Sequence, residues 1–355
     1  MLVAIHKDRY GRFDPFCEIY EKILEHNNIP WIRVDINDAD FWEKIKTVDL
    51  FIYRWIQFDD HIQIAKNIMP IIEFELKVNI HPDNATGWHY DDKIKEYYLL
   101  KQKGYPFIDT WVFYDKKKAL EWVEGVTEYP LVFKLKGGAG SHNVLLAKNK
   151  STAKRLINKM FGSGITSDGM YLPGSLRYKD FKWKNFIRHT GGNLFRLFRG
   201  EDAEPYWQLN KNYVLFQKFL PGNTSDTRVL VIGKRMLAFR RGVRKNDFRA
   251  SGSGIILYDH ESIDIRCLQI ALKVSTEMKF QSMAYDFLFD SDGNPMIAEI
   301  SYTSNDNVVS RCEGYWDENL VFHRRQENWM QYFQLVDLLN MPDLKLPEGL
   351  YYAKN

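Results

Sequence analysis

Residues 283–301 read MAYDFLFDSDGNPMIAEIS, two apolar strands joined by a polar turn. Asp292–Gly293 is a favoured pair for a two-residue hairpin turn, which sets Asp286 directly opposite Glu299 on one face. Like charges in that position repel, so the pair needs a shared proton, a basic neighbour or a divalent cation. Magnesium prefers a few carboxylates together with phosphate oxygens. The hairpin therefore predicts a magnesium site, and a carboxylate that is solvated or paired with Arg or Lys is the alternative.

A second predicted hairpin, residues 227–241, reads TRVLVIGKRMLAFRR and turns at Gly233–Lys234. This register sets Asp226 opposite Arg241. Arginines beside an acid can hold a phosphate or a substrate carboxylate through paired hydrogen bonds. Taken alone, the pattern favours the alternative, an ordinary cross-strand salt bridge on a solvated face, which stabilises little.

A glycine-rich segment, residues 129–144, reads YPLVFKLKGGAGSHNV. Strand alternation puts Lys134 and Lys136 on one face, and Leu131, Phe133 and Leu135 on the other. Glycines let the backbone approach a ligand and direct successive N–H groups at an anion, and lysines add positive charge. No Gly-Lys-Ser/Thr closes the loop, so it is not a Walker A motif. The segment predicts a phosphate site, with a flexible hairpin turn as the alternative.

The composition excludes several classes of protein. The chain has 355 residues, enough for two or three domains, and 49 Lys and Arg against 46 Asp and Glu leave a net charge of only +3. A nucleic-acid coat or a polybasic membrane binder would have a larger surplus, so we expect nucleic acid to be an unlikely partner. No apolar run reaches the length of a membrane helix. The three isolated cysteines fit a reducing, cytoplasmic location.

The first 85 residues alternate strand and helix patterns, which predicts a parallel sheet with crossover helices. Arg54 ends the third strand of this segment, at the edge where such sheets bind ligands. It is therefore a candidate for an anionic substrate, and an ordinary surface arginine is the equal alternative. His89 stands before the next helix, where capping or packing is favoured over an acid–base role.

Residues 162–212 form an insertion rich in basic and aromatic residues. Such a segment could bind a sugar chain, an anionic carrier or single-stranded nucleic acid. The favoured alternative is a loop that packs its aromatic side chains on the neighbouring domain. We hypothesise that it recognises the acceptor, so that deleting it would raise the acceptor's KM and leave the ATP affinity nearly intact.

These elements, in this order, resemble the ATP-grasp superfamily of the RimK/glutathione-synthetase type over residues 1–310. The resemblance rests on Asp92-Lys93 opening a helix, the glycine-rich segment, Gln217–Leu220 followed by Asp226-x-Arg228, and the acids Asp286 and Glu299. It implies an α/β (α+β) fold: an N-terminal Rossmann-like domain (1–85), a nucleotide lid (86–215) and a C-terminal antiparallel-sheet domain (216–355). Residues 88–144 also resemble an uncharacterised branch found with surface-polysaccharide genes.

The resemblance also implies roles for residues. Lys93, Lys134 and Lys136 would contact the ATP phosphates, and Gly137, Gly138, Ala139, Gly140 and Ser141 would form the flap over them. Gln217, Lys218, Phe219 and Leu220 would line the adenine, and Asp226 the ribose. Arg241 would stabilise the transferred phosphoryl group, and Asp286, Glu299 and Ser301 would hold magnesium. Arg54, His89, Arg228, Arg249 and Ser251 are the candidates for binding substrate.

Three positions depart from the family pattern. Lys218 stands where relatives often have Glu, Ser301 where the family has Asn, and Ser251 where many RimK-type members have Asn. Serine is a weaker magnesium ligand than an amide oxygen, so a second metal ion is in doubt.

The resemblance implies an ATP- and Mg²⁺-dependent carboxylate–amine ligase that works through an acyl phosphate. Its partners would be a small-molecule carboxylate and an amine, with a saccharide as a further option for the acceptor, and a homodimer is left open. The alternatives are a small-molecule kinase of the same fold and a non-catalytic module that binds a nucleotide or nucleic acid.

Overall fold

The computed structural model describes residues 1–6, 15–57, 59–138, 143–167, 191, 198, 208–243 and 253–350. The chain divides into two units. Unit 1 is Met1–Tyr90, Thr224–Leu288 and Ile297–Asn355, and unit 2 is Asp91–Asn223 and Phe289–Met296. The N-terminal segment thus shares a unit with most of the C-terminal segment.

A parallel sheet organises the N-terminal part of unit 1, as predicted. Its strands lie in the order β2-β1-β3-β4, and every neighbouring pair is parallel. The elements are β1 (Val3–His6), α1 (Pro15–His26), β2 (Trp31–Val34), α2 (Phe41–Ile45), β3 (Leu50–Ile52), α3 (Asp59–Pro70), η1 (Ile71–Glu75), β4 (Asn79–His81) and α4 (Asn84–Gly87). One face of α1 is apolar and buried, and it includes Ile19, Tyr20 and Ile23.

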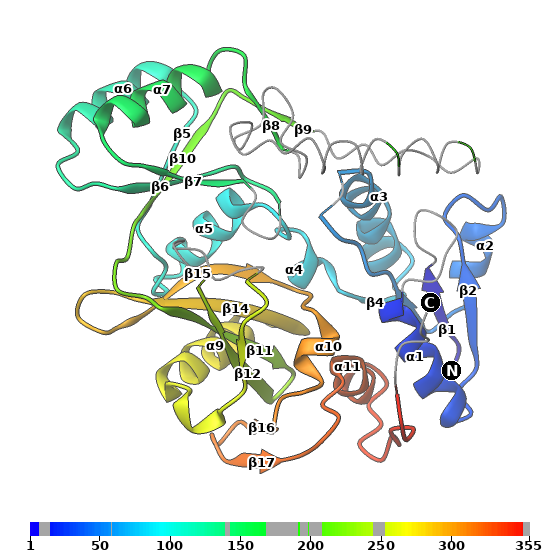
Figure 1. The fold of residues 1–355 in the computed structure, drawn as a ribbon. Helices are drawn as coiled ribbons and strands as arrows, with labels where there is room; N and C mark the ends of the chain where they lie inside the picture. The colour runs from blue at the N-terminus through cyan, green and yellow to red at the C-terminus, as the bar shows by residue number, and fades with distance from the viewer. Residues whose placement is uncertain are drawn as a thin grey trace. The chain divides into compact units, whose positions relative to one another are not determined.

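A seven-stranded sheet forms the rest of unit 1, in the order β15-β14-β11-β12-β16-β17 with β13 paired to β12. The strands are β11 (Ser225–Ile232), β12 (Arg235–Gly242), β13 (Ile256–Leu257), β14 (Ser282–Phe289), β15 (Pro295–Ser301), β16 (Gly314–Trp316) and β17 (Phe322–Arg324). The helices are η3 (His260–Ser262), α9 (Ile265–Met278), α10 (Asp306–Val309) and α11 (Met330–Leu338). Helix α9 lies against this sheet (Figure 1), and a core cluster joins its residues Leu230 and Phe239 to α1 and α11.

Unit 2 is built on a four-stranded sheet in the order β5-β10-β6-β7. Its elements are α5 (Lys93–Gln102), β5 (Thr110–Phe113), α6 (Lys116–Gly125), β6 (Leu131–Lys134), β7 (Val144–Ala147), α7 (Lys150–Met160), β8 (Ile165–Ser167), β9 (Gln208–Asn210) and β10 (Val214–Lys218). Leu131, Phe133 and Leu135 join a core cluster with residues of α6 and α7, two helices that lie side by side (Figure 1). The predicted alternation is confirmed, and it leaves Lys134 on the opposite face of the sheet.

The two predicted hairpins have different outcomes. The β11–β12 register is confirmed, with Asp226 opposite Arg241. The β14–β15 turn is not the predicted two-residue turn, because Asp290 N–H bonds to Asn294 O at 3.0 Å and Gly293 N–H bonds to Asp290 O at 3.1 Å. Gly293 has φ +75°, so the loop has three residues and ends in a left-handed glycine. The prediction that Asp286 lies directly opposite Glu299 assumed a two-residue turn. Because the loop has three residues, that assumption was wrong.

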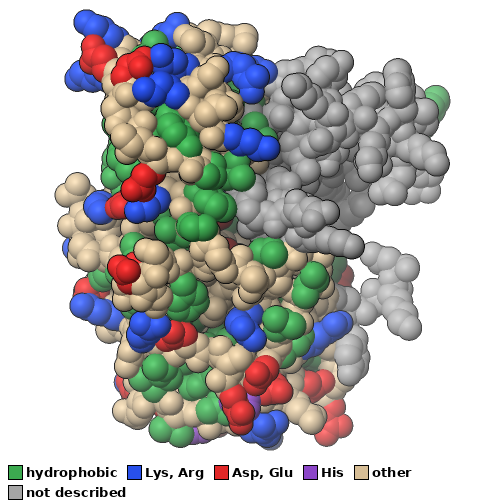
Figure 2. Space-filling view, turned by 60° about the vertical axis from the view of Figure 1, so that its left-hand side comes forward, with side chains coloured by type: hydrophobic (Ala, Val, Ile, Leu, Met, Phe, Trp, Pro, Cys, Tyr) green, Lys and Arg blue, Asp and Glu red, His purple; other side chains and the backbone are tan. Residues whose placement is uncertain are grey.

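The face drawn in Figure 2 carries lysine and arginine side chains interspersed with aspartate and glutamate. Lys150 and Glu124 approach to 3.5 Å, and Lys117 and Glu121 to 3.8 Å. Exposed pairs of this kind stabilise little but prevent a field of one sign. None of the helices in the described part of the chain has the length and apolar composition that a bilayer crossing needs.

Candidate active site

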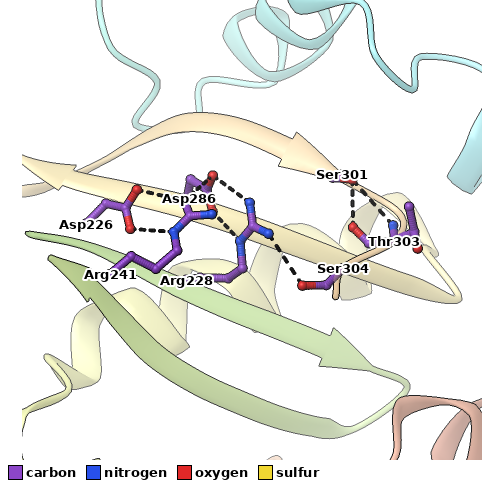
Figure 3. Close-up of polar contacts among 7 residues, drawn as sticks. All are labelled: Asp226, Arg228, Arg241, Asp286, Ser301, Thr303 and Ser304. Carbon is purple, nitrogen blue, oxygen red and sulfur yellow. Dashed lines mark hydrogen bonds and ion pairs between the residues drawn. The ribbon is translucent and has the colours of Figure 1, made fainter. Parts of the chain in front are cut away.

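Four charged side chains meet on one face of the large sheet, and we call them the charge quartet: Asp226, Arg228, Arg241 and Asp286 (Figure 3). Arg241 donates Nε to Asp226 Oδ1 at 2.8 Å and Nη2 to Asp226 Oδ2 at 2.6 Å. Arg228 likewise donates Nε to Asp286 Oδ1 at 2.6 Å and Nη2 to Asp286 Oδ2 at 2.8 Å. Arg241 Nη2 also donates to Asp286 Oδ2 at 2.7 Å, which joins the two pairs. Strand register creates this pattern, because Asp226 faces Arg241 and Arg228 faces Asp286.

Three members of the quartet are buried, with Arg241 only 7% and Asp226 8% exposed, and Arg228 is partly buried. Burial disfavours the charged form of Asp286, but Arg228 and Arg241 outweigh it and hold the pKa of that carboxyl well below its usual range. Burial is the larger effect at Asp226 and raises its pKa despite Arg241. The arrangement therefore carries two positive and two negative groups that compensate one another away from water.

This geometry corrects one expectation. The Asp226–Arg241 pair is a cross-strand salt bridge, as the simpler alternative said, but it is buried rather than on a solvated face. Both oxygens of Asp226 accept from Arg241, and the predicted ribose contact stays a prediction. Arg228 is bonded to Asp286, and its Nη1 reaches Ser304 Oγ at 3.4 Å.

The predicted magnesium ligands Glu299 and Ser301 have different surroundings in the structure. Glu299 is half-buried on β15, the strand beside β14, which carries Asp286. Ser301 Oγ donates to Thr303 O at 2.8 Å, which closes a local turn and favours a structural role over metal binding (Figure 3). Within the described residues, no three His, Cys, Asp or Glu side chains group in a way that could hold a metal ion.

In unit 2, the start of α5 is bonded to the glycine-rich turn. Lys93 N–H donates to Lys136 O at 2.9 Å, and Lys93 Nζ lies 3.4 Å from Gly138 O. Gly138 N–H donates to both carboxylate oxygens of Asp91 at 2.9 Å. Gly138 has φ +106°, a conformation that favours glycine. The turn thus binds a carboxylate of the same protein, and the predicted phosphate contact stays a prediction.

Asp91 was not among the predicted residues. The only sequence feature that marked Asp91 was its position directly before Asp92-Lys93. Its positive φ of +54° is known only from the structure. Asp92 performs the predicted helix opening, because its Oδ1 accepts from Ile94 N and Lys95 N.

Lys134 and Gln217 lie on the same face of the unit 2 sheet, opposite the α6 and α7 side. Register pairs Lys134 with Leu215 and Gln217 with Val132, and cross-strand partners share a face. Lys134 and Gln217 are both buried, and Gln217 Nε2 donates to Thr110 Oγ1 at 3.1 Å. The sheet therefore places the first adenine candidate and a phosphate candidate on one face, and their predicted roles stay predictions.

The predicted adenine-lining segment, Gln217–Leu220, which we call the hinge, continues past the end of β10 at Lys218. Lys218 is exposed and lies 3.8 Å from Glu128, so it does not face the Lys134 side. Leu220 O accepts from Asn223 Nδ2 at 3.2 Å, and the same amide bonds to Phe289 O at 2.9 Å. Asn223 therefore fixes the backbone at Phe219–Leu220.

A known family matches part of the chain. Residues 191–315 match the family model described as the RimK-like ATP-grasp domain. The chain contains a RimK-like ATP-grasp domain. The match begins inside the predicted insertion and ends beyond Glu299, so this domain includes the hinge and the whole charge quartet.

Solved structures share the ATP-grasp fold with this chain. D-cycloserine synthetase DcsG has a TM-score of 0.52 and 13% identity, and the match covers 87% of this chain and 93% of the other. N5-carboxyaminoimidazole ribonucleotide synthetase, solved as an ADP complex, has a TM-score of 0.53 and 11% identity, with coverage of 86% and 71%. Macrocyclase MdnC from Microcystis aeruginosa MRC, bound with its precursor peptide MdnA, has a TM-score of 0.51 and 12% identity, with coverage of 86% and 92%. No curated protein matches the chain.

Two candidates for binding substrate lie in the N-terminal part of unit 1, before the ATP-grasp match. Arg54 is half-buried at the end of β3, donates Nε to Thr303 Oγ1 at 3.3 Å and lies over the Phe16 ring at 4.2 Å. His89 is completely buried and packs against Phe280 with ring centroids 5.4 Å apart. His89 therefore follows the packing alternative, and its predicted contact with substrate is not supported.

Several predicted residues lie outside the described residues. They are Ala139, Gly140, Ser141, Arg249 and Ser251, together with most of the 162–212 insertion. Their predicted roles remain predictions.

Proposed function

We propose that this chain is an ATP-dependent ligase that joins a carboxylate to an amine through an acyl phosphate. The observation that carries the proposal is the anion-binding turn of unit 2, where the buried Lys93 lies beside Gly137–Gly138 and the buried Lys134 ends the strand before it. Lysines and backbone N–H groups in this arrangement suit phosphate oxygens. The RimK-like domain match supports ATP as the phosphate compound.

In the proposed reaction, the substrate carboxylate attacks the γ-phosphorus of ATP and ADP leaves. The amine then attacks the acyl phosphate, releases phosphate and loses a proton as the amide forms. The protein's task is to position groups and to neutralise spreading negative charge. We assign Lys93, Lys134 and Lys136 to the ATP phosphates and Gln217–Leu220 to the adenine.

We assign the stabilisation of the transferred phosphoryl group to one of the two arginines of the quartet. Arg228 has a side chain that is 18% exposed, against 8% for Arg241, and its third nitrogen makes only a long bond to Ser304. Arg228 is therefore the better placed of the two to accept a ligand contact. Arg241, which the resemblance assigned to the transferred phosphoryl group, would instead hold Asp226 and Asp286 in place beside it.

Asp286 has little acceptor capacity left for a magnesium ion. A carboxylate offers about four acceptor positions, and Asp286 uses three of them for arginine N–H groups. The resemblance assigns the ion to Asp286 and Glu299, which would hold it together with oxygens from the ATP phosphates. When bound, the ion would supply positive charge against those phosphates.

We assign the carboxylate to the sugar acids or amino acids. Support comes from the resemblance of residues 88–144 to the branch found with surface-polysaccharide genes.

A screen for ADP release tests the function. The full chain is incubated with ATP and magnesium and with pairs drawn from amino acids, polyamines and uronic acids. The ligase predicts ADP and free phosphate in equal amounts, together with an amide product. ADP with a phosphorylated product and no free phosphate would instead indicate a kinase, and no ADP with any pair would contradict catalysis.

Two variants assign the residues. Lys134→Ala and Glu299→Ala should abolish ADP formation while the circular dichroism spectrum is retained, because the first removes a cation assigned to the ATP phosphates and the second an acid assigned to the magnesium ion. Lys117→Ala, on the exposed face of α6, is the matched control and should keep full turnover. Wild-type turnover in Lys134→Ala would remove that lysine from the site.

A further inference from the structure

A cavity of about 520 Å³ lies in unit 1, and neither the family match nor the sequence motifs assign it a role. Its walls come from η1 and β4, from the β11–β12 turn at Gly233, from Gln281 and from α11. This volume is within the range of pockets that hold small molecules. Its location separates it from the charge quartet, because Gly233 follows the last residue of β11 and Asp226 stands near the first. At ~3.3 Å per strand residue, these positions are roughly 20 Å apart.

The most informative lining residue is His81, which is only 3% exposed. Gln281 Oε1 must be the acceptor in its network, because it receives the backbone N–H of Asp83 at 2.9 Å, while Gln281 Nε2 donates to Ile80 O at 2.9 Å. His81 Nδ1, 2.9 Å from the same Oε1, is therefore the donor. The other ring nitrogen, Nε2, then carries a lone pair, and it has no hydrogen-bond partner among the described residues.

The ring stays neutral at ordinary pH. Burial lowers the pKa of His81 to about 4, against a smaller opposing effect of the Gln281 hydrogen bond. Nε2 is therefore an acceptor, and not a positive charge, on a residue that lines the cavity.

Two carboxylates on the same wall add further acceptors. Glu73 Oε2 accepts from the backbone N–H of Asn84 at 2.7 Å, and Glu73 Oε1 has no partner among the described residues. Asp83 caps α4 by accepting from Thr86 N at 2.8 Å. Burial raises the pKa of Asp83, and the charge of Glu73 adds to the rise, so the two acids are close enough to repel each other.

The other charged residues of the lining, Lys77 and Asp337, do not neutralise these two acids. Asp337 is already paired with Arg235 at 2.9 Å. Lys77 lines the cavity but is exposed, and no ion pair joins it to another described residue. The described residues also contain no group of three metal-ligating side chains, so the lining does not form a metal centre. The chemistry that fits is a compact donor of several N–H bonds.

We propose that this cavity binds a small organic cation that carries a primary amine, with His81 Nε2, Glu73 and Asp83 as its acceptors. An ammonium group has three N–H donors and one positive charge, which match a lone pair and two carboxylates. The site is separate from the proposed ligase site and does not depend on it.

Isothermal titration calorimetry of the full chain at neutral pH, without nucleotide, tests the proposal. The probe is 1,4-diaminobutane, with succinate and 1,4-butanediol as an anionic and a neutral comparison of the same length. We expect binding of the diamine and none of the other two. Absence of diamine binding, or equal binding of the diol, would overturn the proposal.

Two variants locate the binding. Glu73→Gln keeps an acceptor for Asn84 but removes the charge, and it should weaken diamine binding about tenfold. Lys77→Glu adds a negative charge at an exposed position and should tighten binding several-fold. Glu261→Gln, an exposed acid on η3, is the control and should leave the affinity unchanged. Diamine binding that ignores both Glu73→Gln and Lys77→Glu would place the amine elsewhere, including at the proposed ligase site, and would refute the assignment.

Discussion

Single residues in the charge quartet act through compensation. Each carboxylate accepts paired bonds from one arginine, and Arg241 also joins the two pairs. Removing one member of a buried ion pair is costly because the other charge stays buried without its partner. Removing both members costs less, because no isolated charge remains.

This reasoning predicts the stability of three variants. Arg241→Gln should lower the free energy of unfolding by about 3–5 kcal/mol, since Asp226 and Asp286 both lose a charged donor. The double variant Asp226→Asn, Arg241→Gln should lose less than the sum of the two single variants. Urea denaturation measures all three. Strict additivity would show that the two side chains do not interact as the structure describes.

His81 predicts a pH dependence of stability. Its pKa falls from the ordinary value of 6.5 in the unfolded chain to about 4 in the folded one. As the pH drops from 6.5 toward 4, the unfolded state binds a proton that the folded state does not, so stability falls by on the order of 3 kcal/mol. Below pH 4 this loss is complete. His81→Gln, which keeps a donor for Gln281, should lose less stability across this window in urea titrations, and identical slopes for the two proteins would contradict the assignment.

At the scale of an element, the glycine-rich turn depends on what its N–H groups bind. Asp91 occupies the Gly138 N–H with both oxygens, and a Cβ at Gly137 would approach Asp91 Oδ2 to 2.8 Å. A phosphate at this N–H would have to replace the Asp91 carboxylate. The element therefore holds an internal anion in a position that suits an external one.

Asp91→Ala should consequently tighten ATP binding, because the competing carboxylate is removed. We expect the Kd for ATP, measured by calorimetry with magnesium present, to fall several-fold. Asp115→Ala removes a helix-capping acid on α6 instead and should leave this Kd unchanged. Weaker ATP binding in Asp91→Ala would show that Asp91 supports the site and does not compete for it.

At the scale of the whole chain, the first and last segments build one core. Gln331 Nε2 on α11 donates to Phe16 O on α1 at 3.1 Å, and both helices contribute to the same apolar cluster as strands β11 and β12. The N-terminal segment is therefore not independent of the residues that follow the ATP-grasp match.

A fragment of residues 1–90 should accordingly fail to fold alone. Without α11, the buried face of α1 would be exposed to water, and the small parallel sheet would lose much of its core. Circular dichroism and a thermal scan of the fragment measure this. A cooperative transition comparable to that of the intact chain would show that the segment is an independent domain.

The two hairpins show where local sequence is sufficient. Both hairpin predictions placed a two-residue turn at a dipeptide that contains glycine. The β11–β12 register follows from the turn at Gly233–Lys234. In the other hairpin, Gly293 adopts φ +75° as the last residue of a three-residue loop, and the same Asp-Gly pair is compatible with either loop. A dipeptide therefore identified the turn but did not determine its length.

Local pattern by itself determined the parallel N-terminal sheet, the lysine face of the glycine-rich strand and the family resemblance, because periodicity and glycine spacing act over a few residues. Only the tertiary structure decided that Arg228 pairs with Asp286, that Asp91 holds Gly138 and that His81 bonds to Gln281. Those partners are 58, 47 and 200 residues apart in the chain. The order of strands and the burial of charge bring them together, and no short stretch of sequence contains that information.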